Sequence, residues 1–199
     1  MSNYPAIMGF IKFAILATLG EIIARWVLAK KGEFNFALIK KMHLWERALV
    51  WGFLGVIISY VFTIYSVGID TLITQKRLLI IDMDNENIKN ICVAFWKSFW
   101  MNLLFALPLM TFHRVTDTLI DRKELFKFGN WPITNVLYSI DWKNIWTKVA
   151  PTIIWFWIPA HTITFTLPAE YRVFVAALLS ICLGLILALM KAKTMNATK

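Results

Sequence analysis

The residues of this sequence that are most able to do chemistry are ionisable side chains within long apolar stretches. Near the N-terminus, the segment GEIIAR places Glu21 and Arg25 four residues apart, so that on a helix they would share a face. With the acidic residue first, this order favours an intrahelical ion pair. The pair could lie at a helix end, with Arg25 reaching lipid headgroups, or it could face the interior of a bundle and line a polar path.

A second group of polar residues lies in the middle of the chain, in MNLLFALPLMTFHRVTDTLID. Asn102 is within the apolar part of this segment, and Pro108 removes a backbone hydrogen bond. His113, Asp117 and Asp121 recur every four residues, which places them on one face of a helix. A histidine beside a carboxylate suits a proton-sensitive gate, and the alternative is a solvated helix end with local ion pairs. No metal site is predicted, because further ligands would have to converge from elsewhere.

A third group lies in PTIIWFWIPAHTITFTLPAEYR, residues 151–172, which is apolar but contains three prolines and a histidine. Pro159 would free a backbone carbonyl one turn earlier, and His161 and Thr164 could give the segment a polar lining. His161 could equally be a hydrogen-bonded packing residue. The resulting candidates for a pore or transport lining are Glu21, Arg25, Asn102, His113, Asp117, His161 and Thr164, with Pro108 and Pro159 as helix kinks.

Membrane helices are the elements expected to position these candidates. Hydrophobic residues make up 59% of the 199 residues, more than a soluble globular protein usually contains. Several apolar stretches reach about 18 residues or more, which is the length that crosses a bilayer core as a helix. The sequence therefore predicts one integral membrane domain, residues 1–199, with an all-α, polytopic helical bundle fold.

Five membrane helices are predicted, at about residues 6–29, 48–69, 91–115, 149–167 and 173–190. A four-helix alternative leaves the segment 149–167 at the membrane surface. The Trp-rich segment 131–147 predicts an amphipathic helix in the interface, in contact with membrane lipids.

The positions of the lysines and arginines predict how the chain is oriented. These residues concentrate in alternate connections, which by the positive-inside rule places the N-terminus outside and the C-terminus in the cytoplasm. The expected location is a bacterial cytoplasmic membrane, since no organelle-targeting feature is evident. The same pattern explains the formal charge of +9 without nucleic-acid binding.

Small residues recur at every fourth position of the last apolar segment, where they would let another helix approach closely. The approach could occur within the bundle or between copies in a homo-oligomer, and the residues concerned are Ala176, Ser180, Gly184 and Ala188. Cys92 and Cys182 lie in apolar stretches without a second ligand nearby, so neither a disulfide nor a cofactor is expected. No nucleophile elbow, phosphate loop or dinucleotide fingerprint is found, which argues against an enzyme.

Three short motifs are similar to a known pattern. GEIIAR looks like G-D-x-x-x-Q, with Glu21 at the acidic position and Arg25 at the glutamine. KSFWMNLLFALP, residues 97–108, loosely follows a lysine, then D-Q, then a proline. Near the C-terminus the pattern is W-P-x-x-Q-x-x-N-F, then V-P and an arginine. There, His161 stands at the glutamine and Thr164 at the asparagine, and the outline is kept by Trp157, Phe165, Pro168 and Arg172.

On these motifs the chain resembles the Mpv-seventeen / 22-kDa peroxisomal membrane protein family, as a divergent and prokaryotic member. The resemblance implies a small multi-span protein with a channel or carrier role for an unidentified small solute or ion. An alternative from a different class is a non-transporting membrane scaffold, lipid-binding or assembly protein. A lipid-modifying enzyme that uses His113 and Asp117 is a third, for which the sequence displays no converging site.

Overall fold

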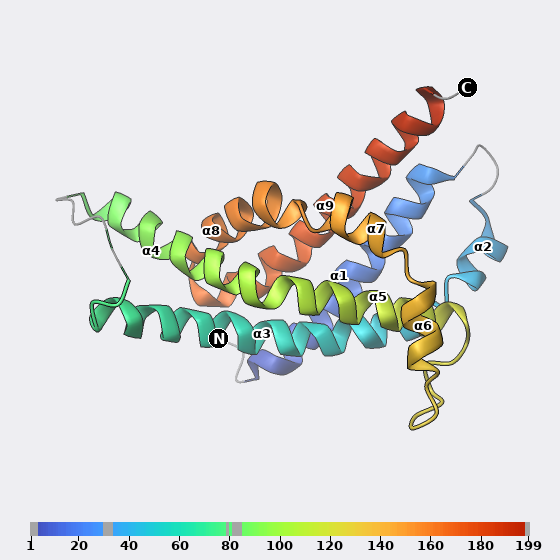
Figure 1. The fold of residues 1–199 in the computed structure, drawn as a ribbon, viewed down its shortest axis with the longest axis horizontal. Coiled ribbons are helices and arrows are strands. Elements are labelled where there is room, and N and C mark those ends of the chain that lie inside the picture. Colours follow the sequence, from blue (N-terminus) through green and yellow to red (C-terminus); the bar gives the residue numbers. More distant parts are fainter. Residues whose placement is uncertain (1–3, 30–33, 79, 81–84, 198–199) are drawn as a thin grey trace.

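The computed structural model of the protein describes residues 4–29, 34–78, 80 and 85–197, and in these the only regular structure is helical (Figure 1). The all-α prediction is therefore confirmed. In chain order, with η for a π-helical segment, the elements are α1 (Pro5–Leu28), α2 (Phe36–Lys41), α3 (Leu44–Thr74), α4 (Glu86–Met101), η1 (Asn102–Ala106), α5 (Leu107–Asp121), α6 (Ile133–Ser139), α7 (Trp142–Asn144), η2 (Ile145–Val149), η3 (Ile153–Trp157), α8 (Ile158–Thr166) and α9 (Ala169–Ala197).

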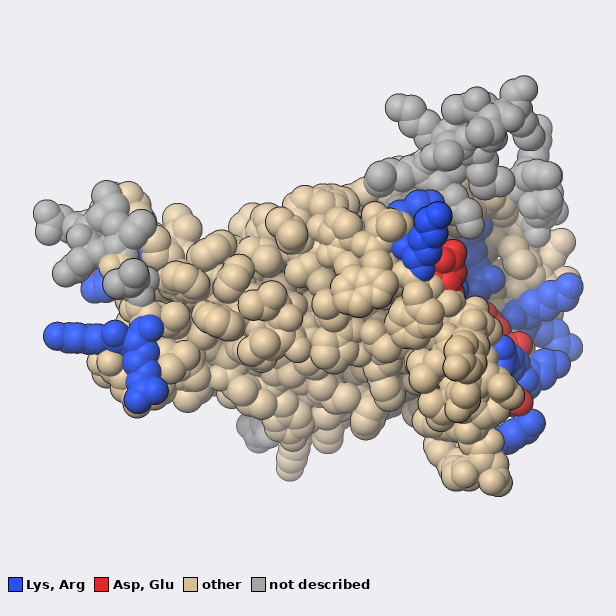
Figure 2. All heavy atoms as spheres, viewed as in Figure 1, with Lys and Arg blue, Asp and Glu red and all other residues tan. Residues whose placement is uncertain are grey.

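Four helices of the described chain are long and apolar enough to cross a membrane: α1, α3, the continuous helix Glu86–Asp121, and Ala169–Ile186 of α9. On the face drawn in Figure 2, charged side chains gather at the two ends of the elongated molecule, and a broad uncharged belt separates them. On α1 a stripe of exposed side chains is wholly apolar, namely Ile7, Ile11, Ile15, Leu19 and Ile23. Such a surface is suited to lipid and not to water, so the protein is integral to a membrane.

The fourth predicted span takes a different form from the other four. Within residues 149–167 the helical part comprises η3, of 5 residues, and α8, of 9 residues, and α8 packs along α4. Leu167 ends α8 in an extended conformation, as expected of a residue that precedes a proline. This helix is shorter than the other four, and its crossing of a bilayer remains a prediction.

Residues 131–147 do not form one continuous amphipathic helix. The structure divides the region into α6, α7 and the start of η2, with an extended residue, Ile140, after α6. The Asp141 carboxylate then accepts a hydrogen bond from the backbone N–H of Asn144 at 2.9 Å. An aspartate that binds backbone N–H groups in this way starts a new helix, which is why the chain turns here.

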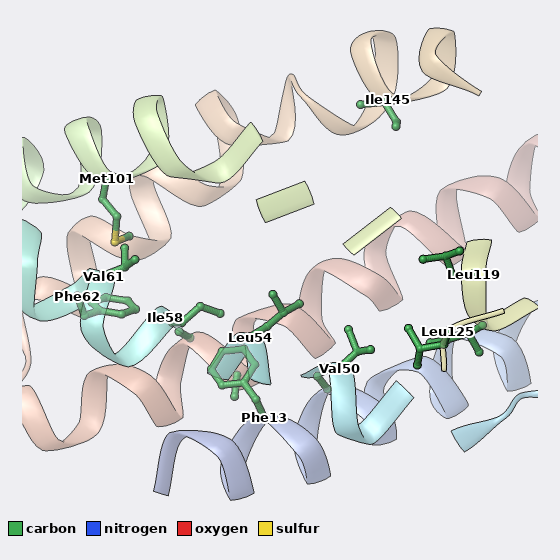
Figure 3. Close-up of a cluster of buried hydrophobic side chains, with 14 of the residues drawn as sticks. Phe13, Val50, Leu54, Ile58, Val61, Phe62, Met101, Leu119, Leu125 and Ile145 are labelled. Carbon is green, nitrogen blue, oxygen red and sulfur yellow. The ribbon is translucent and has the colours of Figure 1, made fainter. Parts of the chain in front are cut away.

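Where α1 and α3 cross, glycine residues allow the two backbones to approach each other closely. A Cβ atom at Gly55 would clash with the backbone oxygen of Gly9 and lie 2.7 Å from the Cβ of Phe13. Beside this crossing, Phe13 and Leu54 are almost fully buried and point into the apolar core, with Ile58 close by (Figure 3). Close packing of small residues is a common means of helix association in membranes.

Candidate functional site

A cavity of about 310 Å³, partly open to the outside, lies between the helices of the bundle. Its walls come from α1, α3, α9, the continuous helix α4–η1–α5, and the segments η2, η3 and α8. Along α4–η1–α5 the two polar lining residues are Asn102 and His113, separated by about 16 Å at roughly 1.5 Å per residue. Most lining side chains between these two are apolar, so the cavity has polar groups at two ends and an apolar middle.

A buried arginine dominates the end of the cavity at which His113 lies. The side chain of Arg47 is only 3% exposed, and its Nη1 lies 2.6 Å from Asp117 Oδ1 and 3.2 Å from Glu21 Oε2. Its Nη2 lies 2.6 Å from Asp121 Oδ1, and its Nε donates to the backbone oxygen of Met42 at 2.8 Å. One guanidinium thus joins α1, α3 and α5, as its planar fork of donors allows.

Two aromatic side chains extend this charged cluster toward the cavity. Trp51 Nε1 donates to Glu21 Oε1 at 2.5 Å, and the Trp51 and His113 rings have centroids 4.2 Å apart. His113 Nε2 is 3.6 Å from Asp117 Oδ2. The predicted shared face of His113, Asp117 and Asp121 therefore forms, and it is turned toward Arg47. We call these six residues, Glu21, Arg47, Trp51, His113, Asp117 and Asp121, the charged cluster.

Three members of the charged cluster have atoms that could also hold a metal ion. One oxygen each of Glu21 and Asp117 and one nitrogen of His113 lie within 4.8 Å of one another. Both carboxylates, however, are already in contact with the Arg47 guanidinium. The arginine supplies the positive charge that a metal would supply, so the charged cluster is an ion-pair network as it stands.

The pairing predicted for Glu21 is wrong. Glu21 bonds Arg47 and Trp51 of α3, and the structure records no ion pair between the described residues Glu21 and Arg25. Arg25 is partly exposed and does not line the cavity. The crossing of α1 and α3 brings a buried guanidinium to Glu21, and this outcompetes a more exposed partner on its own helix.

The other end of the cavity holds a neutral cluster, which we define as Ser98, Asn102 and His161. Asn102 is 2% exposed, and its Nδ2 donates to the Ser98 backbone oxygen at 2.8 Å. The Asn102 amide also meets His161 Nδ1, with Nδ2 at 3.1 Å and Oδ1 at 3.3 Å. The Asn102 amide can donate to or accept from this ring nitrogen, so it pairs with either neutral tautomer of His161.

Two prolines and a shared backbone oxygen lie close to the neutral cluster. Pro108 and Pro159 each follow a π-helical segment, η1 and η3, because a proline has no N–H to continue the α-helical pattern. The backbone oxygen of Ile158, one residue before Pro159, accepts hydrogen bonds from Ser98 Oγ and from Thr162 Oγ1, both at 2.7 Å. Hydroxyl groups of this kind make irregular backbone tolerable inside a membrane protein.

An ion pair between α4 and α3 lies beyond the neutral cluster. Lys97 Nζ is 2.8 Å from Asp70 Oδ2, although Lys97 itself is 8% exposed.

Close to α8, Arg172 donates to the backbone oxygens of Phe165 and Leu167 at 3.2 and 2.9 Å and so caps the end of that helix. This is the arginine that the resemblance identifies, here in a structural role.

Four of the seven predicted lining residues line the cavity: Glu21, Asn102, His113 and His161. Asp117 lies behind them in the charged cluster, and Thr164 is fully buried with its hydroxyl bonded to the Ala160 backbone oxygen at 2.9 Å. Of the small residues on α9, Ala176, Ser180 and Gly184 also line it, while the side chain of Ala188 is outside the described part. An added Cβ at Gly184 would meet no atom within 4 Å, so these residues border open space, and a close helix approach on this face stays a prediction, as does a homo-oligomer.

Sequence reasoning missed three residues of the two clusters: Arg47, Trp51 and Ser98. Arg47 stands directly before the predicted span 48–69, and Trp51 follows one turn later on the same face. That spacing was a usable signal, because a cation one turn from an indole at a span boundary can reach inward. Ser98 lies one turn before Asn102, a weaker signal of the same kind.

Comparisons of this chain with protein-family models, curated proteins and solved structures found no match. The resemblance to the Mpv-seventeen family therefore remains a prediction from the motifs. The functional conclusion depends on the geometry of the cavity and its two polar clusters.

Proposed function

We propose that the protein is a channel or carrier that passes a small solute through the bundle, in the manner implied by the Mpv-seventeen resemblance. The supporting observation is the single cavity shared by Glu21 and His113 at one end and Asn102 and His161 at the other. Ionisable and amide side chains are costly inside a membrane and are typically found along substrate paths. Here they converge on one space from four helical elements.

The spacing of polar groups along the helix α4–η1–α5 supports a path of membrane thickness. Lys97, Asn102, His113 and Asp117 succeed one another on this helix. The separation of Lys97 and Asp117 corresponds to about 30 Å at roughly 1.5 Å per residue. A bilayer core is also about 30 Å thick, so a solute following this helix would meet polar groups toward both sides and an apolar stretch between Asn102 and His113.

In this proposal the charged cluster is the gate. The Arg47 guanidinium closes that end of the cavity by bonding carboxylates from two helices, and its release would open a passage. Three carboxylates around one guanidinium leave the entrance net negative, which favours neutral or cationic solutes over anions. The charged end that includes α2 and α6 would face the cytoplasm, where Lys and Arg side chains concentrate (Figure 2).

Solute flux in proteoliposomes tests the proposal. Vesicles with the purified protein should swell in gradients of glycerol or urea, or conduct potassium ions, faster than empty vesicles. Gly184→Leu should reduce the flux at least several-fold, because Gly184 lines the cavity and a Cβ there meets no atom within 4 Å. Gly68→Leu is the matched control, since Gly68 has equally open surroundings and is outside the cavity.

Substitutions in the two clusters complete the test. Glu21→Gln and His161→Ala should each change the rate or the ion selectivity, since both residues line the cavity. Absence of flux in the wild-type protein, with both variants identical to it, would reject transport. That result would favour the non-transporting scaffold, for which a dry and fully packed bundle is expected in place of a cavity of about 310 Å³.

A further inference from the structure

Four adjoining aromatic rings lie at the end of the bundle at which α3 begins and α5 ends. Trp45 of α3 stacks on Phe126, with ring centroids 5.0 Å apart and planes inclined by 2°. Phe126 then meets Phe128 at 6.0 Å, and Phe128 meets Trp131 at 5.9 Å. We call these four residues the aromatic row. The side chains of Trp45 and Phe128 are 63% and 70% exposed, and adjoining exposed apolar groups of this size mark a contact surface.

The loop that carries three of these rings has a defined shape. Where α5 ends, the backbone N–H of Lys123 donates to the backbone oxygen of Ile120 at 2.9 Å, and Lys123 has a left-handed φ of 58°. Trp131 Nε1 donates to the backbone oxygen of Leu125 at 3.0 Å, and the Leu125 side chain is buried in the core. These bonds fix both ends of the loop, so its exposed rings are held in place.

The aromatic row continues an apolar face of α3. Phe53, Leu49 and Trp45 are spaced four residues apart, so they share one face of this helix, and all three are exposed. Because α3 is long and apolar enough to cross a membrane, this face is suited to lipid. Trp45 is in the first turn of α3, at the height where indole rings typically meet lipid headgroups. Figure 1 shows the yellow loop between α5 and α6 projecting sideways from this end of the bundle, and therefore along the surface of a bilayer that α3 crosses.

Basic side chains accompany the aromatic row. Within residues 122–131 the sequence has three basic residues and one acidic residue. The acidic residue, Glu124, is partly buried, and its Oε1 lies 3.7 Å from Lys127 Nζ. Asp121, which precedes the loop, is already paired with Arg47. The loop therefore exposes a net positive charge, carried by Arg122, Lys123 and Lys127. Positive charge of this kind is attracted to anionic lipid headgroups.

We propose that the aromatic row, together with Lys123 and Lys127, is a docking surface for anionic phospholipids. The rings lie in the headgroup layer, and the ammonium groups contact the negative headgroups. Aromatic rings beside lysines also suit single-stranded nucleic acid, whose bases stack on such rings. Continuity with the exposed apolar face of α3 favours lipid, because it brings the rings to the membrane surface. This docking surface is separate from the cavity and does not depend on transport.

The first test asks whether the aromatic row lies in lipid, and it uses the full-length protein in lipid nanodiscs. 4-Fluorophenylalanine in place of Phe128 reports on the row by fluorine NMR. Phosphatidylcholine with a nitroxide on its headgroup should broaden this signal strongly, and a water-soluble gadolinium chelate should broaden it less. The same label in place of Phe13, which is 1% exposed, should respond only weakly to both. Strong broadening of the label at position 128 by the chelate alone would overturn the proposal and favour a soluble partner.

The second test measures selectivity for negative charge, by native mass spectrometry of the detergent-solubilised protein. The wild-type protein should retain phosphatidylglycerol in preference to phosphatidylcholine. Lys123→Gln with Lys127→Gln should weaken this retention about 5-fold or more, since one basic residue near an anionic surface is worth about 1 kcal/mol. The matched control is Lys76→Gln with Arg77→Gln, which removes the same charge from exposed positions just after α3 and should leave retention unchanged. Equal losses in the two double variants, or no loss in either, would overturn the assignment of this loop to anionic lipid.

Discussion

The charged cluster and the neutral cluster solve the same problem in different ways. Both place polar side chains from separate helices in a buried site, but one uses a guanidinium with three carboxylates and the other an amide, an imidazole and a hydroxyl. The charged cluster keeps a route to solvent, since the Asp121 side chain is 59% exposed. Asn102 and His161 are 2% and 9% exposed.

This difference follows from the cost of desolvation. Removing an ion from water costs several kcal/mol, so ions gather where water remains close to one of the partners. Neutral groups need only matched donors and acceptors, which two helices can provide in the middle of a bundle. A path that includes both clusters would expose a solute to ionic contacts at its entrance and to hydrogen bonds inside.

Removal of the central cation should have the largest effect on the charged cluster. Arg47→Met leaves the carboxylates of Glu21, Asp117 and Asp121 without a counter-charge, and loss of one partner in such a site costs about 3–5 kcal/mol. Thermal unfolding in mild detergent should show a strongly lowered midpoint or no folded protein. Arg114→Met is the control, because Arg114 is exposed on the same helix as the two aspartates. Equal midpoints for both variants would show that the guanidinium is dispensable.

An intermediate effect is expected in the neutral cluster. Asn102→Leu leaves His161 and Ser98 without the amide, and an unsatisfied buried group costs about 1–3 kcal/mol. In the same unfolding assay, the double substitution Asn102→Leu with His161→Leu should be less destabilised than the single one, because two apolar replacements leave fewer polar groups unpaired. A double variant that is worse than the single would mean that packing, and not hydrogen bonding, holds this cluster.

The smallest effect should come from the exposed edge of the charged cluster. Asp121→Asn should cost about 0–1 kcal/mol, since an ion pair with a largely exposed partner contributes little. Asp117→Asn should lower the unfolding midpoint further, because the Asp117 side chain is only 17% exposed. Added salt should narrow the difference between wild type and Asp121→Asn. If Asp121→Asn instead proved the more damaging of the two, the description of a buried centre with a solvated edge would be incorrect.

Local patterns in the sequence predicted the parts of the site that lie on one helix. The four-residue spacing of His113, Asp117 and Asp121 does place them on one face, because side chains four apart on a helix lie close together. The same rule failed for Glu21 and Arg25. Spacing states which residues can meet on a helix, but it does not show that a partner from another helix is nearer and less solvated.

The sequence by itself determined that this is an all-helical membrane protein, since long apolar stretches must satisfy their backbone groups within helices. It also identified four of the polar side chains that line the cavity, Glu21, Asn102, His113 and His161. Only the tertiary structure decided their partners: Arg47 meets Asp117 across 70 residues of chain, and Asn102 meets His161 across 59. Such pairings depend on how helices cross, and crossings such as that of Gly9 and Gly55 are set by packing over the whole bundle.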